Sequence, residues 1–155
     1  MGDSKTMEAD RVTGEVFRHR FRVADGDLDG NRHANNAVYL RWMNDGQEAF
    51  FAHAGLATEW LRDRGAAPVV AETRILYKHP LFGGDDAVLE IWLSEVGRAS
   101  AWVEFRFLTP EGQVAATGRQ RGTFVNPETQ KLTCLGPKEH ERMRRFLRAE
   151  GSGAG

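Results

Sequence analysis

The segment DLDGNRH, residues 27–33, gathers side chains that can activate water or orient a carbonyl group. It places a carboxylate at Asp29, an amide at Asn31 and an imidazole at His33, each two residues from the next. Carboxylates and imidazoles serve as general bases or nucleophiles. The spacing therefore indicates a small polar site, and its use depends on the element that comes next in the chain.

A helix is expected to begin directly after this segment. Either Asn35 or Asn36 is a good N-cap, because an amide oxygen there can accept a free backbone N–H of the first turn. Unpaired N–H groups and the helix dipole at such an end polarise a carbonyl oxygen. A base or nucleophile would then stand beside donors for an oxyanion.

Each of these residues also has an ordinary structural interpretation. Asp27 and Asp29 are typical of Asx turns, and His33 can fix a loop through a backbone hydrogen bond. The spacing taken together favours a functional site over these separate roles.

The helix is predicted to run from Ala37 to about Gly55, a suitable C-terminal stop. Its apolar positions form one stripe toward a core, made of Leu40, Met43, Phe50, Phe51 and Ala54.

Three polar or small residues stand out in this helix. Gly46 either allows close packing against a strand or leaves room for a ligand or a second copy of the helix. Gln47 replaces an apolar residue, so its amide must bond within the subunit, across a two-fold axis or in a pocket. Asp45 is expected on the solvated face, with a site shared between subunits as the alternative.

Strands surround this helix in the sequence. A first strand alternates apolar and arginine residues around Phe17 and Phe21, and four more strands follow, joined by short turns. Those turns predict that the last four form an antiparallel meander against the helix. A charged terminal helix is anchored by Met143 and Phe146. The fold class is therefore α+β.

Length and composition indicate one domain at residues 13–149, between flexible tails at 1–12 and 150–155. The chain has 155 residues, 41% apolar and 28% charged, with a net charge of -1, which favours neither nucleic acid nor a membrane as partner. A single cysteine and no signal-like segment predict a cytoplasmic protein.

The stretch DLDGNRHANNAVYLRW resembles the D-x-D-x-N-x-H-x-N-N-x-x-Y signature of the hotdog-fold thioesterases, which include 4-hydroxybenzoyl-CoA thioesterase and plant acyl-ACP thioesterases. Similarity continues weakly from about Val16 to Asn126. The resemblance implies a hotdog fold, in which a curved antiparallel five-stranded sheet wraps a long central helix. It also implies a homodimer joined at the sheet edges, with active sites at the interface; tetramers are common in the family.

The resemblance further implies hydrolysis of an acyl-CoA or acyl-carrier-protein thioester. Asp29 would activate water or attack the carbonyl itself, Asn31 and His33 would orient the reacting groups, and the Asn36 backbone N–H would bind the oxyanion. No metal and no other cofactor are expected. The sequence departs from the plant enzymes in one respect. Those enzymes carry a further acid, and the corresponding place here, close to His79 and Pro80, has no acid.

Trp42, Asp45 and Gln47 are the candidate substrate-binding residues, and the aromatic content suits an aromatic, polyketide or medium-length acyl group. Two other functions remain open. One is a non-catalytic acyl-thioester-binding protein, and the other is a hotdog hydratase or dehydratase.

Overall fold

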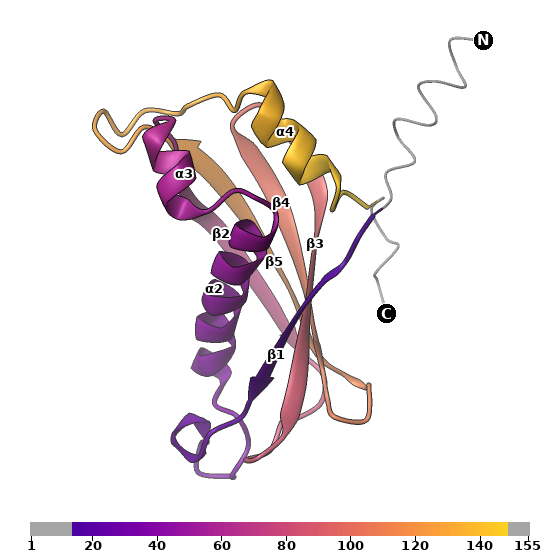
Figure 1. Ribbon diagram of the computed structural model, residues 1–155. Helices are drawn as coiled ribbons and strands as arrows, with labels where there is room; N and C mark the ends of the chain where they lie inside the picture. The colour runs from indigo at the N-terminus through magenta and orange to yellow at the C-terminus, as the bar shows by residue number, and fades with distance from the viewer. Residues whose placement is uncertain (1–13, 149–155) are drawn as a thin grey trace, which may run out of the picture.

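A computed structural model describes residues 14–148, so both predicted tails lie outside the described residues. In chain order its elements are β1 (Phe17–Arg22), the 3-10 turn η1 (Asp25–Asp27), α2 (Asn36–His53), α3 (Thr58–Asp63), β2 (Ala67–Tyr77), β3 (Asp86–Val96), β4 (Ser100–Leu108), β5 (Val114–Val125) and α4 (Pro137–Arg144). A strand, a long helix, four strands and a short terminal helix confirm the α+β prediction. The sheet curves around one side of α2 (Figure 1).

The five strands lie in the order β1-β3-β4-β5-β2, and every neighbouring pair is antiparallel. The predicted four-strand meander is therefore wrong in one respect, because β2 pairs with β5 and not with β3. The 78–85 connection instead carries the chain from one side of the sheet to a strand beside β1. This crossing places residues of the connection against the segment that precedes α2.

Helix α2 begins and ends where local chemistry predicts. The Asn35 side chain accepts a hydrogen bond from the Ala37 N–H at 3.0 Å, and Gly55 follows the last turn with a φ of 80°. The predicted stripe is wrong at Leu40, which is 43% exposed, while the neighbouring Tyr39 is buried. Tyr39 takes that place because its ring packs against aromatic rings on two strands.

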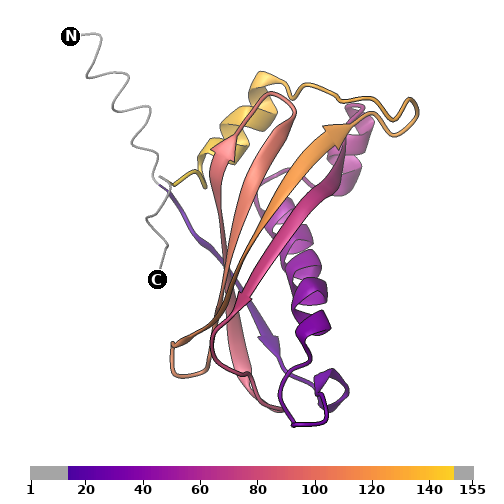
Figure 2. The ribbon, with the colours of Figure 1, turned by 180° about the vertical axis from the view of Figure 1, so that it is seen from behind.

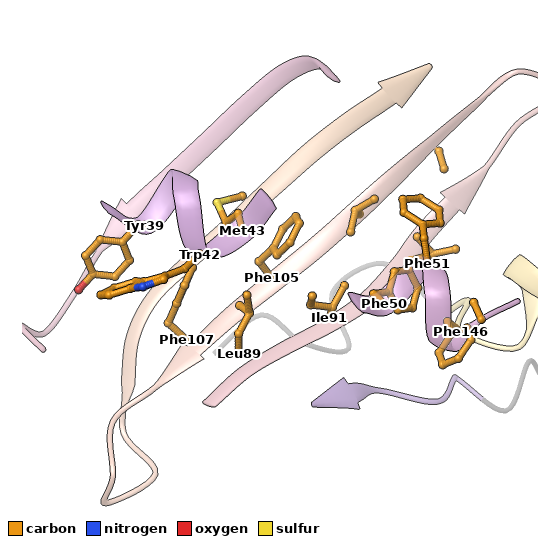
Figure 3. Packing of buried hydrophobic residues seen from close by; sticks show 14 of the residues in the cluster. Tyr39, Trp42, Met43, Phe50, Phe51, Leu89, Ile91, Phe105, Phe107 and Phe146 are labelled. Carbon is orange, nitrogen blue, oxygen red and sulfur yellow. The ribbon is translucent and has the colours of Figure 1, made fainter. Parts of the chain in front are cut away.

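The buried face of α2 packs on the sheet from end to end (Figure 3). Tyr39 and Trp42 meet Phe107 at one end, Met43 lies in the middle, and Phe50 meets Phe146 edge-on at the other, with ring centroids 4.9 Å apart. Met143 and Phe146 are each 1% exposed, which confirms them as the anchors of the terminal segment.

Gly46 lies on α2 directly against side chains of β3. A Cβ atom added there would lie 2.7 Å from Leu89 Cδ2 and 3.1 Å from Ile91 Cδ1. These contacts confirm the packing interpretation of Gly46, because no space for a ligand remains between the helix and β3.

The two ends of the molecule differ. The loop before α2 lies at the lower end in Figure 1, together with the 78–85 connection, while α3 and α4 lie at the opposite end. Viewed from behind, β2 forms one free edge of the sheet (Figure 2).

Candidate active site

The segment from Asp29 to His33 forms a closed loop immediately before α2. The Asp29 N–H donates to the His33 carbonyl oxygen at 2.7 Å, and the Arg32 N–H donates to the Asp29 carbonyl oxygen at 3.0 Å. Arg32 has a φ of 63°, a conformation that few residues other than glycine adopt. This turn at Arg32 directs the neighbouring N–H groups toward the Asp29 side chain.

One carboxylate oxygen of Asp29 is held by the loop backbone. Its Oδ1 accepts hydrogen bonds from the Asn31 N–H at 2.8 Å and the His33 N–H at 3.1 Å. Its Oδ2 accepts none from residues 14–148, and the residue is exposed. The loop therefore fixes the carboxylate while leaving one oxygen open to a water or a substrate.

Asp27 has the opposite environment. It is 5% exposed, and its carboxylate accepts from the Arg41 guanidinium at 2.5 Å and from the Ala24 N–H at 2.9 Å. Burial alone would raise the pKa of Asp27, but the Arg41 and Ala24 hydrogen bonds and the Arg41 charge outweigh it, and the pKa is lowered. Its backbone carbonyl also accepts the Asn35 N–H at 2.8 Å. Asp27 therefore ties the loop to α2.

The first turn of α2 presents an unused donor. Asn35 caps the Ala37 N–H, whereas the Asn36 N–H donates no hydrogen bond within residues 14–148. The Asn36 carbonyl accepts a hydrogen bond from the Tyr77 hydroxyl of β2 at 2.9 Å. The helix mouth thus keeps a free N–H group on Asn36, a residue whose carbonyl is bonded to β2.

The 78–85 connection packs against the end of the loop that joins α2. The Ala34 N–H donates to the Leu81 carbonyl oxygen at 2.8 Å, and His33 and Phe82 form an isolated antiparallel bridge. The His33 ring lies edge-on to the Phe82 ring with centroids 5.2 Å apart. Sequence reasoning did not identify this support.

The position of Tyr77 beside α2 was not predicted from the sequence either. The sequence indicates only that Tyr77 is an aromatic residue at the end of a β-branched run. Its ring packs edge-on against Tyr39 at 5.1 Å. Burial raises the pKa of Tyr77, and burial together with the nearby Tyr77 raises the pKa of Tyr39 to about 12. Both hydroxyls therefore stay protonated at neutral pH.

The structure brings Asp29, Asn31, His33 and Asn36 together but places the three candidate substrate-binding residues elsewhere. Trp42 is 5% exposed and packs on Phe21 with ring centroids 4.5 Å apart, so packing accounts for its burial. Asp45 lies on the exposed face of α2.

Gln47 lies on the wall of a pocket between α2 and the β2 side of the sheet. This Gln47 pocket has a volume of about 200 Å³ and is lined by Asn44, Gln47, Glu48, Phe51, Leu56, Thr58, Pro68, Val69, Val70, Ala101, Val103, Gly122 and Phe124. Gln47 is eleven residues beyond Asn36, which is roughly 16 Å along a helix axis. The pocket and the Asp29 loop of one chain are therefore well separated.

The described residues were also searched for metal-binding groups and membrane-spanning helices. Among residues 14–148, no group of three or more His, Cys, Asp or Glu side chains is placed to hold a metal ion. No helix in that part of the chain is long and apolar enough to span a membrane.

Comparison with known proteins places the chain among thioesterase-like sequences. Residues 23–145 match the thioesterase-like superfamily. The chain is 26% identical over 116 residues to the proposed acyl-CoA thioesterase YneP of Bacillus subtilis (strain 168), an alignment that covers 75% of this chain and 84% of YneP.

Solved structures show the same architecture. A Staphylococcus aureus protein, SAV2348, in complex with CoA is 16% identical with a TM-score of 0.80, covering 86% of this chain and 84% of that one. A Thermus thermophilus thioesterase complexed with CoA and Zn is 27% identical with a TM-score of 0.70, covering 83% and 92%. These likenesses confirm the hotdog fold.

Proposed function

The chain belongs to the thioesterase-like superfamily, and from that premise we propose that it hydrolyses an acyl-CoA or acyl-carrier-protein thioester to a free acid and a thiol. The observation that carries the proposal is the Asp29 carboxylate at the mouth of α2, with Oδ1 held by two backbone N–H groups and Oδ2 open. CoA is the first carrier to test, because two similar structures contain it.

In the proposed reaction, Asp29 takes a proton from a water molecule as the water oxygen bonds to the thioester carbonyl carbon. The Asn36 N–H and the N-terminal dipole of α2 stabilise the oxyanion that develops. Collapse of the tetrahedral species breaks the C–S bond, and the leaving thiolate recovers the proton from Asp29.

Asn31 and His33 act in this scheme by orientation. Their backbone N–H groups fix Asp29, and their side chains position the water or the carbonyl group. Direct attack by Asp29 is the second route, in which an anhydride forms and water then hydrolyses it. Hydrolysis in ¹⁸O-labelled water under single-turnover conditions separates the routes, since attack on the anhydride can label the Asp29 carboxylate.

We propose a homodimer formed through the β2 edges, with a tetramer as a further assembly. The proposal is supported by the difference between the two sheet edges. β1 has six residues and turns three arginines outward, whereas β2 has eleven residues and exposes Val69, Val70 and Leu76. A long apolar edge is a template for pairing with another strand.

Such pairing would also bring the two parts of the site together. In an antiparallel β2–β2 pair related by a two-fold axis, the α2 helices run in opposite directions. The Asp29 loop of one chain would then approach the Gln47 pocket of the other, which supports an active site built from both chains.

The test is release of free thiol from a panel of aliphatic and aromatic acyl-CoAs by wild type and Asp29→Asn. The substituted amide keeps an oxygen for the Asn31 and His33 N–H groups, so the loop is expected to survive while the charge is lost. Turnover should fall roughly 10²–10⁴-fold, the usual share of a general base.

Asp25→Asn is the matched control, because Asp25 is an exposed acid in the same loop region. It should retain wild-type turnover. Equal activity of wild type and Asp29→Asn would remove Asp29 from the reaction. Tight acyl-CoA binding without hydrolysis of CoA or carrier-protein thioesters would favour the non-catalytic binder, and addition of water to an enoyl thioester would favour the hydratase.

A further inference from the structure

Gln120 on β5 is a buried amide that uses only part of its hydrogen-bonding capacity. It is 0% exposed. Its Nε2 donates to the hydroxyl oxygen of Thr73 on β2 at 3.2 Å, while its Oε1 has no partner within residues 14–148. A buried oxygen without a partner destabilises the fold, and an apolar residue here would avoid that cost. The bond to Thr73 is therefore the feature that needs an explanation.

Gln120 and Thr73 lie on the face of the sheet that packs against α2. Two residues before Gln120, a Cβ on Gly118 would lie 3.0 Å from Met43 Cε of α2. Two residues after it, Gly122 lines the pocket between α2 and the sheet. Thr73 pairs in register with Gln120, so it shares this face.

Thr73 differs from Gln120 in its exposure. It lies on the edge strand and is exposed to solvent. Its hydroxyl oxygen accepts the bond from Gln120, and its hydroxyl hydrogen is donated to no residue of the described chain. Gln120 therefore orients an exposed hydroxyl at the β2 edge, and that hydroxyl keeps one hydrogen for an acceptor from outside residues 14–148.

The β2 edge has one regular half. The register between β2 and β5 shifts between Val70 and Glu72, so the regular half runs from residue 72 to the end of the strand at Tyr77. In an antiparallel pair, directly opposite side chains share a face of the sheet. If β2 pairs with its own copy about a two-fold axis, one residue therefore lies on that axis opposite itself.

Like charges exclude several positions of the axis. An axis at Glu72 or at Arg74 would set that residue opposite its own copy, and an axis at Leu76 would set Arg74 opposite Lys78 of the partner subunit. Like charges directly opposite each other destabilise a strand pair. An axis at Tyr77 would leave most of the regular half unpaired, because β2 ends there.

The register shift decides between the two positions that remain. An axis at Thr73 would draw the irregular residues before Glu72 into the ladder. An axis at Ile75 pairs residues 72–78 of the two copies without that irregularity. It also sets Glu72 opposite Lys78 of the partner subunit, which are opposite charges. The axis at Ile75 is therefore the favoured register.

We propose that β2 pairs with its copy about an axis at Ile75 and that each chain thereby supplies Thr73 to the active site of the other. In this register, Thr73 of the partner subunit lies directly opposite Tyr77, with Cβ atoms about 4.5–5.5 Å apart. Tyr77 donates to the Asn36 carbonyl at the mouth of α2. The partner's hydroxyl is thereby placed at the helix end that carries the proposed oxyanion donor.

This inference rests on the proposed function, because it takes an acyl thioester as the ligand. A hydroxyl that already accepts a bond from Gln120 binds an acceptor. A thioester offers the carbonyl oxygen at the reacting carbon and the amide carbonyl oxygens of the pantetheine arm, which CoA and carrier proteins share. Thr73 is the donor to one of these carbonyl oxygens, and Gln120 is its positioning residue.

Disulfide trapping tests the register. A Cys134→Ser background removes the exposed native thiol. One chain then carries Arg74→Cys, the other carries Leu76→Cys, and the heterodimer is purified through two different affinity tags. The proposed axis sets these positions opposite each other, so mild oxidation should cross-link the chains. Cross-linking of a Glu72→Cys and Arg74→Cys pair instead would place the axis two residues earlier and overturn the proposal.

Two heterodimers of equal composition test whether Thr73 serves the other chain. In the split heterodimer, one chain carries Asp29→Asn and the other carries Thr73→Val. In the joined heterodimer, one chain carries both substitutions and its partner is wild type. Both are purified through the same tags, and thiol release is measured. In a homodimer, Thr73→Val should lower kcat/KM about tenfold, the effect of one hydrogen bond.

The split heterodimer keeps one site in which Asp29 and Thr73 are both present, if they come from different chains. It should retain about half of the wild-type kcat/KM, whereas the joined heterodimer should retain about a twentieth. The reverse order would show that Thr73 serves its own chain and would overturn the proposal. Equal kcat/KM of the Thr73→Val and wild-type homodimers would overturn it as well.

Two further variants separate a positioning role from a folding role. Thr73→Ser keeps the hydroxyl and should keep turnover. Gln120→Met should lower turnover of the wild-type chain and add nothing to Thr73→Val, because Gln120 acts through that hydroxyl. Losses that add in the double variant would show that Gln120 serves only the fold and would overturn its positioning role.

The kinetic constants identify the carbonyl oxygen that Thr73 binds. A lower kcat at constant KM in Thr73→Val indicates the thioester carbonyl, and a higher KM at constant kcat indicates the pantetheine arm. Absence of turnover by wild type on every thioester would overturn the proposed function and this inference with it. Turnover by wild type with the two heterodimers in reverse order would overturn this inference alone.

Discussion

Two carboxylates that are two residues apart have distinct roles at the residue scale. Asp27 is buried and bonded to Arg41, whereas Asp29 is exposed and bonded only to backbone N–H groups. A buried, ion-paired carboxylate has a structural role, because its removal leaves its partner without a hydrogen-bond acceptor. The exposed Asp29 keeps one oxygen for chemistry.

The first prediction concerns the pH dependence of the Asp27–Arg41 pair. The folded-state pKa of Asp27 is below its ordinary value of 3.8, so its ionised form stabilises the folded chain. That contribution is complete above the ordinary pKa and is lost as the pH falls through the lower folded-state pKa.

Asp27→Asn should therefore reduce the free energy of unfolding by about 1–2 kcal/mol at pH 7, a modest value because the Arg41 side chain is 58% exposed. The difference from wild type should shrink as the pH falls below about 4. Urea denaturation at pH 7 and pH 3 measures both values. A difference that is constant across this range would show that the charge of Asp27 contributes nothing.

The second prediction concerns Tyr77, whose hydroxyl donates a hydrogen bond to the carbonyl of Asn36, the residue whose N–H is the proposed oxyanion donor. Tyr77→Phe keeps the ring against Tyr39 and removes this hydrogen bond between β2 and α2. We expect a loss of about 0.5–1.5 kcal/mol in stability and a decrease in kcat with little change in KM. Steady-state kinetics with the best acyl-CoA measures kcat and KM separately, and an unchanged kcat would show that Asn36 is positioned without Tyr77.

At this scale the sequence predicted the members of the loop but not their geometry. The spacing of Asp29, Asn31 and His33 is a local pattern, and the structure brings these residues together. The convergence of two N–H groups on one Asp29 oxygen depends on the positive φ of Arg32, which an arginine does not signal. The contact with Phe82 depends on a chain crossing far along the sequence.

At the scale of elements, α2 is positioned by close approach to β3. Gly46 permits this approach, because the space of its absent side chain is filled by Leu89 and Ile91. Leu89 is fully buried, so it cannot move into solvent to make room. The glycine lowers helix propensity and allows denser packing.

The third prediction is that Gly46→Ala destabilises the wild-type chain but not a Leu89→Val chain. Overpacking typically costs about 1–3 kcal/mol, and the gain in helix propensity is about 1 kcal/mol, so a net loss of about 1 kcal/mol is expected. Leu89→Val removes the Cδ2 atom that lies 2.7 Å from the new Cβ.

In the Leu89→Val background, Gly46→Ala should be neutral or slightly stabilising. Chemical denaturation of all four proteins gives the coupling energy directly. Additive effects would mean that Leu89 does not limit the approach of α2 to β3.

The ends of α2 could be predicted from sequence because caps are local: Asn35 bonds the next turn and Gly55 adopts a positive φ. The exposure of Leu40 and the pairing of β2 with β5 could not be predicted from the sequence. Tyr39 replaces Leu40 on the buried face because of rings on β2 and β4. The position of β2 depends on β1 occupying the place beside β3, which short turns alone do not reveal.

At the scale of the whole molecule, the free β2 edge and the divided site point to the same assembly. One chain presents the Asp29 loop at one end of α2 and the Gln47 pocket about 16 Å away along the helix, so a compact acyl group cannot fill the pocket while its carbonyl meets the Asp29 of the same chain. The proposed pairing of two chains at β2 would remove this separation.

The fourth prediction follows from that division of the site. Leu76 on β2 is 65% exposed, and a lysine on a sheet edge opposes strand pairing. Wild type should sediment with a mass of at least two 17.4 kDa chains, whereas Leu76→Lys should sediment as a monomer at micromolar concentration.

The monomer should lose thioester turnover while keeping the circular dichroism of the folded chain, because each chain then lacks a loop beside its pocket. Leu132→Lys is the control, since Leu132 is 68% exposed but lies outside β2; it should leave both mass and turnover unchanged. A monomeric Leu76→Lys protein with full turnover would show that one chain holds a complete site. The thioester would then have to reach Asp29 without using the Gln47 pocket of a second chain.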